Sequence, residues 1–252
     1  MLYLCRVNLK NEGMNYNELN YQGIQSERQW DVSEAFPVLM RKVYVWMTLA
    51  LVITGITAYG VATSPGILQA IYTNQILFWG LVIAEFALVF GVSAAINRLS
   101  LTTATLMFVL YSIINGALFS YIFLAYTMSS VATVFFITAG TFGAMALLGY
   151  TTKTDLSSMG KILFMALIGL IIATVVNVFI KSSGLTLILS YVGVLIFVGL
   201  TAWDSQKIKQ MLLQAPDAGE GAQKLALLGA FTLYLDFINL FIYLLRIFGK
   251  RK

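Results

Sequence analysis

The stretch FTLYLDFINLFIYLLRIFG, residues 231–249, places one acidic residue, Asp236, in the middle of a mostly apolar run. The run covers about residues 225–248, which is long enough to cross a bilayer, since a spanning helix needs about 20 mainly apolar residues. Within a bilayer the backbone N–H and C=O groups must be satisfied inside the segment, and the run is too long and too uniformly apolar for a barrel strand. The stretch therefore predicts a transmembrane helix.

The composition of the whole chain agrees with a membrane protein. Hydrophobic residues make up 59% and charged residues 11% of the 252 residues, whereas soluble domains carry about 25% charged residues. The chain has no histidine and a single cysteine, Cys5, which excludes His-based catalysis, histidine-ligated haem or zinc, and a disulfide within the chain. The net charge is +5. We attribute it to basic loop residues that orient the chain in the membrane and contact anionic lipid, and we expect no nucleic acid partner.

Six further apolar runs precede the first stretch, so we predict an all-α membrane protein. Its seven transmembrane helices lie at about residues 38–63, 76–97, 101–126, 129–150, 162–180, 184–204 and 225–248. We divide the chain into a polar, disordered tail at residues 1–37 and a seven-helix membrane domain at residues 38–252. Within the tail, Met14 is a candidate true start, in which case residues 1–13 are not native.

The basic residues beside the predicted spans indicate which side each loop faces. Nine of them lie on the side of the N-terminus, and one, Lys181, lies in the loops of the opposite side. Cytoplasmic loops carry the excess of Lys and Arg, so we expect the N-terminus in the cytoplasm. The basic residues of RIFGKRK (246–252) then fall on the other side, against this rule. The alternative is a re-entrant last segment with both termini inside.

The last span carries polar side chains along one face. They recur every three or four residues: Thr232, Asp236, Asn239, Tyr243 and Arg246. At about 100° per residue this spacing forms a single stripe, which cannot face lipid. We therefore place this helix centrally. The stripe either joins helices through hydrogen bonds or lines an ion path, in which Asn239 and Tyr243 would take part. The membrane-buried aspartate favours the ion path.

Ionisable residues inside spans are costly, which makes each of them a functional candidate. Besides Asp236, the candidates are Glu85 within the second span, Arg98 at its end and Asp204 at the end of the sixth. With the N-terminus inside, Asp204, Asp236 and Arg98 all lie toward the cytoplasmic face. Taken alone, Asp204 is more typical of a solvated helix end than of an ion ligand, and Arg98 is most typical of an interfacial anchor.

The two aspartates would form a proton-sensitive site if they touch. Two carboxylates in contact cannot both ionise easily, so the pair can sense pH without histidine. When ionised, the pair offers the hard oxygen ligands that Ca²⁺ prefers.

Three segments resemble the Bax inhibitor-1 (transmembrane Bax inhibitor motif) family over about residues 36–249. They are LYLDFINLFIYLLRIFG (233–249), WDSQKIK (203–209) and KTDLSSMG (153–160). The resemblance implies a fold of six helices around a central seventh, and a pH-sensitive calcium leak channel in a bacterial inner membrane.

The same resemblance implies roles for individual residues. Asp204 and Asp236 match the family's paired sensor aspartates, which we also take as the ligands of the ion. Arg98 matches the arginine that latches this pair, and Glu85 matches a glutamate of the ion path. A change in the protonation of the pair would then loosen the latch and let Ca²⁺ pass.

Two other functions compete with the leak channel. One is an interaction protein that modulates a membrane protease or quality-control complex through residues 14–37. The other is an intramembrane aspartyl protease, which the absence of a Gly-x-Gly-Asp motif disfavours. A nucleotide-dependent enzyme is also disfavoured, because the sequence contains no Gly-rich phosphate-binding loop. We therefore expect no enzyme activity and no cofactor, with Ca²⁺ as the permeant ion.

Overall fold

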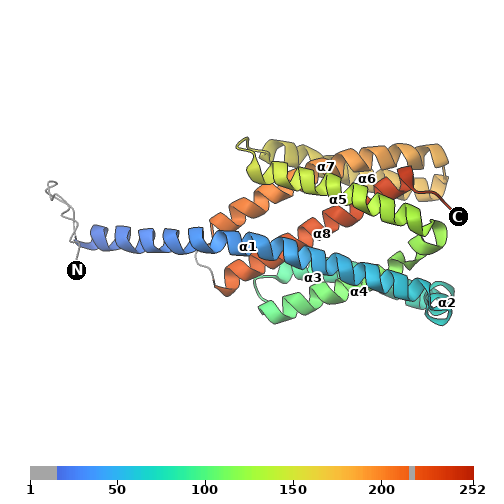
Figure 1. The fold of residues 1–252 in the computed structure, drawn as a ribbon, viewed down its shortest axis with the longest axis horizontal. Coiled ribbons are helices and arrows are strands. Elements are labelled where there is room, and N and C mark those ends of the chain that lie inside the picture. Colours follow the sequence, from blue (N-terminus) through green and yellow to red (C-terminus); the bar gives the residue numbers. More distant parts are fainter. Residues whose placement is uncertain (1–15, 216–218) are drawn as a thin grey trace.

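A computed structural model describes residues 16–215 and 219–252, with side chains from residue 35 onward. Figure 1 shows a bundle of long helices, with the chain entering at one end and finishing at the other. The regular elements of the described residues are all helices: α1 (Tyr16–Ala62), α2 (Pro65–Thr73), α3 (Gln75–Ala95), α4 (Leu101–Ala125), α5 (Met128–Thr151), α6 (Ser157–Ile180), α7 (Ser183–Leu213) and α8 (Glu220–Phe248).

The seven predicted spans are confirmed, because every helix except α2 is long and apolar enough to cross a membrane. The bounds differ most at one end of the bundle. There α6 begins at Ser157 rather than 162, α7 continues to Leu213 rather than ending at 204, and α8 begins at Glu220 rather than 225. These extra turns contain polar residues, so a search for apolar runs misses them. At about 1.5 Å per residue, α7 is longer than the hydrocarbon core is thick.

The connection after the first span forms a helix, α2, that we did not predict. Pro65 stands at its first turn, a position where the missing N–H costs no hydrogen bond. Asn74 separates α2 from α3, and its Oδ1 accepts hydrogen bonds from the backbone N–H groups of Ile76 (3.1 Å) and Leu77 (3.2 Å). A helix of nine residues is too short to give a clear apolar period, which explains the omission.

Helix α1 begins well before the membrane. It runs without interruption from Tyr16 through Pro37 to Ala62, while its apolar part begins at Ala35. The residues from 16 to 37 are therefore helical, whereas we expected a disordered tail. Several residues of this segment, such as Asn17, Asn20 and Gly23, have low helix propensity. The segment therefore continues a helix that the apolar span has already begun, because extending a helix costs less than starting one. The predicted start at Met14 and the segment 1–13 lie outside the described residues.

Helix α8 is the most buried of the seven spans. It packs against α1, α4, α5 and α7, whereas α3 packs mainly on α4, and α6 on α7. In Figure 1, α8 crosses behind the space between α1 and α5. An aromatic cluster fixes α4 to α8 through edge-to-face ring contacts with centroids 5.1–5.8 Å apart, formed by Phe108, Tyr111, Phe231 and Tyr234. The central position of α8 is thus seen in its burial, but an arrangement of six helices around it is not confirmed.

Two pairs of helices approach each other at glycines. A Cβ atom at Gly149 of α5 would stand 2.0 Å from the backbone oxygen of Ala202 in α7. A Cβ atom at Gly116 of α4 would stand 2.6 Å from the backbone oxygen of Thr54 in α1. Any larger residue at these two positions would force the helices apart.

The two ends of the bundle differ in their connections. The end where α1 enters, which we call the N-terminal face, carries the α3–α4, α5–α6 and α7–α8 connections. At the opposite end, the C-terminal face, residues 250–252 bind the α4–α5 connection. The Lys250 N–H donates to Ser130 Oγ (2.8 Å), and the Lys252 N–H donates to the Ala125 oxygen (3.0 Å). Because α8 is one continuous helix of 29 residues, the last segment is not re-entrant.

Candidate functional site

Asp204 lies inside a helix and not at its end. Helix α7 continues for nine residues beyond it, to Leu213. Ile208 and Leu212, one and two turns further on, are buried and hold this part of α7 on the bundle. The side chain of Asp204 is only 7% exposed. The solvated helix-end interpretation of Asp204 is therefore wrong.

Asp236 lies on α8 beside Asp204, and the two carboxyl groups interact electrostatically. Asp236 is 5% exposed, and among the described residues Asp204 is the charged group that acts on its carboxyl group. Its Oδ2 is the one buried side-chain oxygen or nitrogen of the described residues that has no hydrogen-bond partner. An unpaired buried polar atom is costly unless a proton, a water molecule or a cation satisfies it. A hydrogen bond between the Asp204 and Asp236 carboxyl groups requires a proton on one of them, so a proton held by the pair is enough to satisfy this site.

The part of α7 that carries Asp204 is fixed to its neighbours by hydrogen bonds. The Ser205 hydroxyl donates to the Ala146 oxygen of α5 (2.8 Å) and lies 3.4 Å from the Tyr44 hydroxyl of α1. Gln206 bridges the α5–α6 connection, since its Nε2 donates to the Thr154 oxygen (2.8 Å) and its Oε1 accepts from the Leu156 N–H (2.9 Å). These bonds position Asp204 from three directions.

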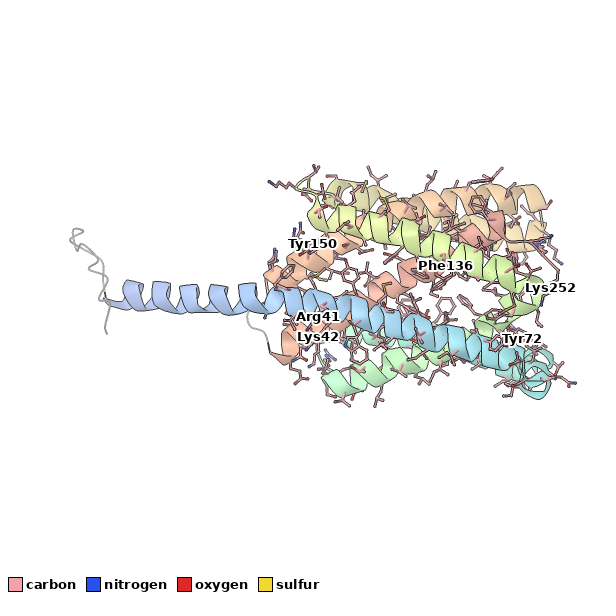
Figure 2. The ribbon with its side chains drawn as sticks, viewed as in Figure 1. Arg41, Lys42, Tyr72, Phe136, Tyr150 and Lys252 are labelled. Carbon is pink, nitrogen blue, oxygen red and sulfur yellow. The ribbon has the colours of Figure 1, made fainter. Side chains whose placement is uncertain are left out.

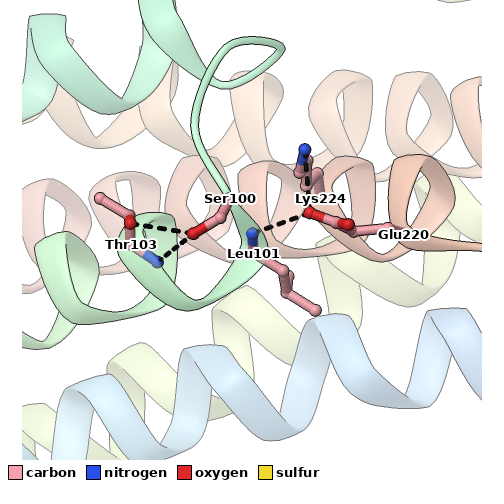
Figure 3. Close-up of polar contacts among 5 residues, drawn as sticks. All are labelled: Ser100, Leu101, Thr103, Glu220 and Lys224. Atoms are coloured by element: carbon pink, nitrogen blue, oxygen red, sulfur yellow. Dashed lines mark hydrogen bonds and ion pairs between the residues drawn. The ribbon is translucent and has the colours of Figure 1, made fainter.

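The start of α8 is fixed in a similar way, as Figure 3 shows. Glu220 Oε1 accepts a hydrogen bond from the Leu101 N–H of α4 (3.1 Å) and pairs with Lys224 Nζ (3.1 Å). Ser100 caps α4 by accepting from the Thr103 N–H (3.1 Å). The first turn of α8 is therefore tied to the start of α4 at the N-terminal face.

The structure does not bring Arg98 to the two aspartates. Arg98 is exposed in the α3–α4 connection and forms no ion pair with any described residue. The positive charge that acts on Asp204 comes instead from Lys207, whose Nζ lies 4.9 Å from the centre of the Trp203 ring. Helix α3 packs mainly on α4, which keeps its end away from α7. The latch role of Arg98 rests on the resemblance alone.

The remaining residues of the predicted stripe on α8 make local contacts. Asn239 Nδ2 donates to the backbone oxygen of Leu235 in its own helix (2.8 Å). The Tyr243 ring stacks on Phe197 of α7 with centroids 5.9 Å apart, and the Arg246 guanidinium lies over the Tyr243 ring at 5.5 Å. The stripe therefore faces α7, as its position on the helix allows. Of its members, only Asp236 has a buried side-chain oxygen or nitrogen without a hydrogen-bond partner.

Glu85 belongs to a second polar group, which the sequence did not reveal. Asn115 of α4 donates a short hydrogen bond to Glu85 Oε1, and the Tyr234 hydroxyl of α8 donates to Asn115 Oδ1 (3.2 Å). The Tyr234 hydroxyl also lies 2.7 Å from Thr54 Oγ1 of α1, and Tyr111 contacts Asn115 Nδ2 at 3.4 Å. We call these five residues the Asn115 network. A search for charges in spans finds Glu85, but its neutral partners look like ordinary packing residues.

Helix α8 separates the aspartate pair from the Asn115 network. Tyr234 and Asp236 are two residues apart, so their side chains point about 200° apart around the helix. Asp236 faces α7, while Tyr234 faces α4 and α1. The structure thus joins Asp204 to Asp236, and Glu85 to Tyr234, on two different faces of one helix.

A family model and several known proteins are similar to this chain. A family model described as "Inhibitor of apoptosis-promoting Bax1" matches residues 37–252. The "Inner membrane protein YbhL" of Escherichia coli K12 is 49% identical over 214 residues, covering 84% of this chain and 92% of that protein. An uncharacterized protein of Borreliella burgdorferi is 44% identical over 213 residues, covering 84% and 92%. An uncharacterized membrane protein of Streptococcus pyogenes serotype M1 is 42% identical over 184 residues, covering 73% and 79%.

Proposed function

The chain belongs to the Bax inhibitor-1 family of membrane proteins, and from this premise we propose that it is a pH-sensitive calcium leak channel of the bacterial inner membrane. The observation that carries the proposal is the unpartnered Oδ2 of Asp236, buried beside Asp204. We propose no enzyme activity and no cofactor, with Ca²⁺ as the ion that passes and the N-terminus in the cytoplasm.

The buried pair supports a coupling between protons and helix packing. Two ionised carboxylates at one buried place repel each other, whereas a shared proton or a bound cation relieves the repulsion. The packing of α7 on α8 would then depend on what occupies the pair. The two side chains supply four carboxylate oxygens, fewer than the six to eight ligands of a calcium site. Water molecules would have to supply the remaining ligands. Such incomplete coordination is better suited to transient binding of a permeating ion than to a permanently bound one.

In this proposal the Asn115 network forms the second polar step of the ion path, on the other face of α8. It contains Glu85, the other acidic side chain within the spans. Lys207, which is exposed at the N-terminal face, supplies the charge next to Asp204. The proposal requires no contact from Arg98.

A calcium flux assay in liposomes across pH 6–8 tests the proposal. We expect Asp236→Asn to reduce the difference in flux between pH 6 and pH 8 by at least about tenfold, because the change removes one titrating member of the pair. Asp204→Asn and the double variant should behave in the same way. A double variant that keeps both the flux and its pH dependence would contradict the proposal.

Asp155→Asn is the matched control for this assay. Asp155 is exposed in the α5–α6 connection on the N-terminal face. Hydrogen bonds from the hydroxyl and the backbone N–H of Ser157 hold the pKa of Asp155 below its ordinary value. Its carboxylate therefore stays ionised throughout pH 6–8, and the variant should keep the flux and pH dependence of the wild type.

A second candidate function is that of an interaction protein for a membrane protease or quality-control complex. The observation that favours it is α1, which begins at Tyr16, before the apolar part that starts at Ala35. A helix that continues outside the bundle offers a surface to a partner. Deleting residues 14–34 should then abolish co-purification of the partner and leave the calcium flux within about twofold of wild type. Unchanged co-purification would argue against this function.

A further inference from the structure

The seam between α1 and α5 holds two hollows, and the two helices make few contacts apart from the stacked rings of Phe36 and Tyr150, whose centroids lie 6.3 Å apart. Near the N-terminal face the seam opens into a groove of about 510 Å³, with an apolar wall formed by Met40, Met47, Phe142 and Leu147. Figure 2 shows Arg41 on α1 and Tyr150 on α5 at this end of the bundle. A smaller cavity of about 100 Å³ follows along the same two helices, with Phe237 of α8 in its lining.

The charges of the seam lie at one end only. Arg41 lines the groove and is exposed. Lys209 approaches the same end, where its Nζ donates to the Tyr150 backbone oxygen (2.8 Å) and lies 5.0 Å from the centre of the Tyr150 ring. No acidic residue is among the described residues that line the groove or the cavity. The groove therefore combines a basic end with an apolar wall.

We propose that the α1–α5 seam binds an anionic phospholipid of the surrounding membrane, with the phosphate of its headgroup at Arg41 and an acyl chain along the groove. Basic pockets between transmembrane helices bind anionic headgroups. Within a bilayer the acyl chain exchanges one apolar environment for another, so the groove adds affinity through van der Waals packing along the chain.

The groove lies next to the candidate site, and Tyr44 connects the two. Tyr44 lines the groove, and its hydroxyl contacts Ser205, the residue after Asp204. A lipid in the groove would therefore contact Tyr44, the side chain that packs against α7 at Ser205. The lipid site stands on its own geometry and does not depend on the proposed ion flux.

Native mass spectrometry of the full chain in detergent, with added phosphatidylglycerol or phosphatidylcholine, tests the headgroup contact. The wild type should retain the anionic lipid about fivefold more tightly than the zwitterionic one, the effect of one basic side chain at an anionic surface. Arg41→Gln should remove this preference. Lys153→Gln changes an exposed basic residue of the same face that does not line the groove, and it should keep the preference. Equal preference in wild type and Arg41→Gln would overturn the proposal.

A glycine in the groove allows a test of the acyl site. Gly143 lines the groove, and a Cβ atom there would meet nothing within 4 Å. Gly143→Leu should therefore fill the groove without disturbing the fold and weaken binding of both lipids about tenfold. Gly140→Leu is the matched control, because Gly140 lies on the same helix in equally open space but outside the groove. Equal lipid binding by the two variants, or a dimer without lipid in the wild-type spectrum, would overturn the proposal.

Discussion

Gly149→Leu is expected to lower the free energy of unfolding by about 3 kcal/mol or more, through overpacking of the core. A Cβ atom at this position would stand 2.0 Å from the backbone oxygen of Ala202, and a backbone atom cannot move aside as a flexible side chain can. Separating α5 from α7 would also break the bond from Ser205 to the Ala146 oxygen. For a chain of this length, the loss corresponds to a fall in melting temperature of about 10 °C, measurable by thermal unfolding in detergent.

Gly140→Leu is again the control for this substitution. It places the same side chain on the same helix, but a Cβ atom at Gly140 would meet nothing within 4 Å. Its melting temperature should stay within about 2 °C of wild type, as is usual for surface changes. A folded Gly149→Leu protein with an unchanged melting temperature would show that α5 and α7 do not pack as closely as described.

Asn115→Leu is expected to destabilise the protein by about 3 kcal/mol. Asn115 is 3% exposed and donates to Glu85 while accepting from Tyr234. Leucine of similar size removes both bonds, while Tyr234 keeps its contact to Thr54 and Glu85 keeps its hydrogen bond to Tyr111. The loss is therefore that of two hydrogen bonds, and the one to the carboxyl group contributes about 1.5–3 kcal/mol. Thermal unfolding in detergent measures the loss. Asn97→Leu, at an exposed position just after α3, should have no comparable effect.

A second substitution identifies the cause of this loss. In the Asn115→Leu variant, Glu85 keeps Tyr111 as its remaining partner. If the Glu85 carboxyl group without Asn115 is responsible for the loss, adding Glu85→Leu to Asn115→Leu should restore part of the stability, because removing both partners of a buried bond is nearly neutral. A double variant less stable than Asn115→Leu alone would mean that the Glu85–Tyr111 bond stabilises the protein by more than the buried carboxyl group costs.

The sequence was a good guide to the membrane spans, because lipid-facing residues must be apolar whatever they pack against. It failed where helices leave the membrane. The turns of α7 beyond Asp204 follow from Ile208 and Leu212, one turn apart and both buried, but this two-residue signal is weak within a polar segment. The short helix α2 was missed although Ser64 and Pro65 form a typical helix start.

For the candidate site, the sequence predicted which charged residues take part but not which residues surround them. Asp204 and Asp236 stand out because ionisable residues in spans are rare, and the structure places them together. Their neighbours depend on how each helix is rotated about its axis, which the sequence does not specify. For this reason the exposure of Arg98, the charge of Lys207 beside Asp204 and the partners of Glu85 emerged only from the structure.

The placement of Tyr234 and Asp236 on opposite faces of α8 has a thermodynamic consequence. One rigid helix carries both side chains, so a rotation of α8 that alters the surroundings of one must alter those of the other. Substitutions at the two faces should therefore be non-additive although the residues share no partner, with an interaction energy above the roughly 0.3–0.5 kcal/mol found for independent sites. Such an interaction energy would show that the two polar faces are coupled through α8 itself, without a chain of contacts around the helix.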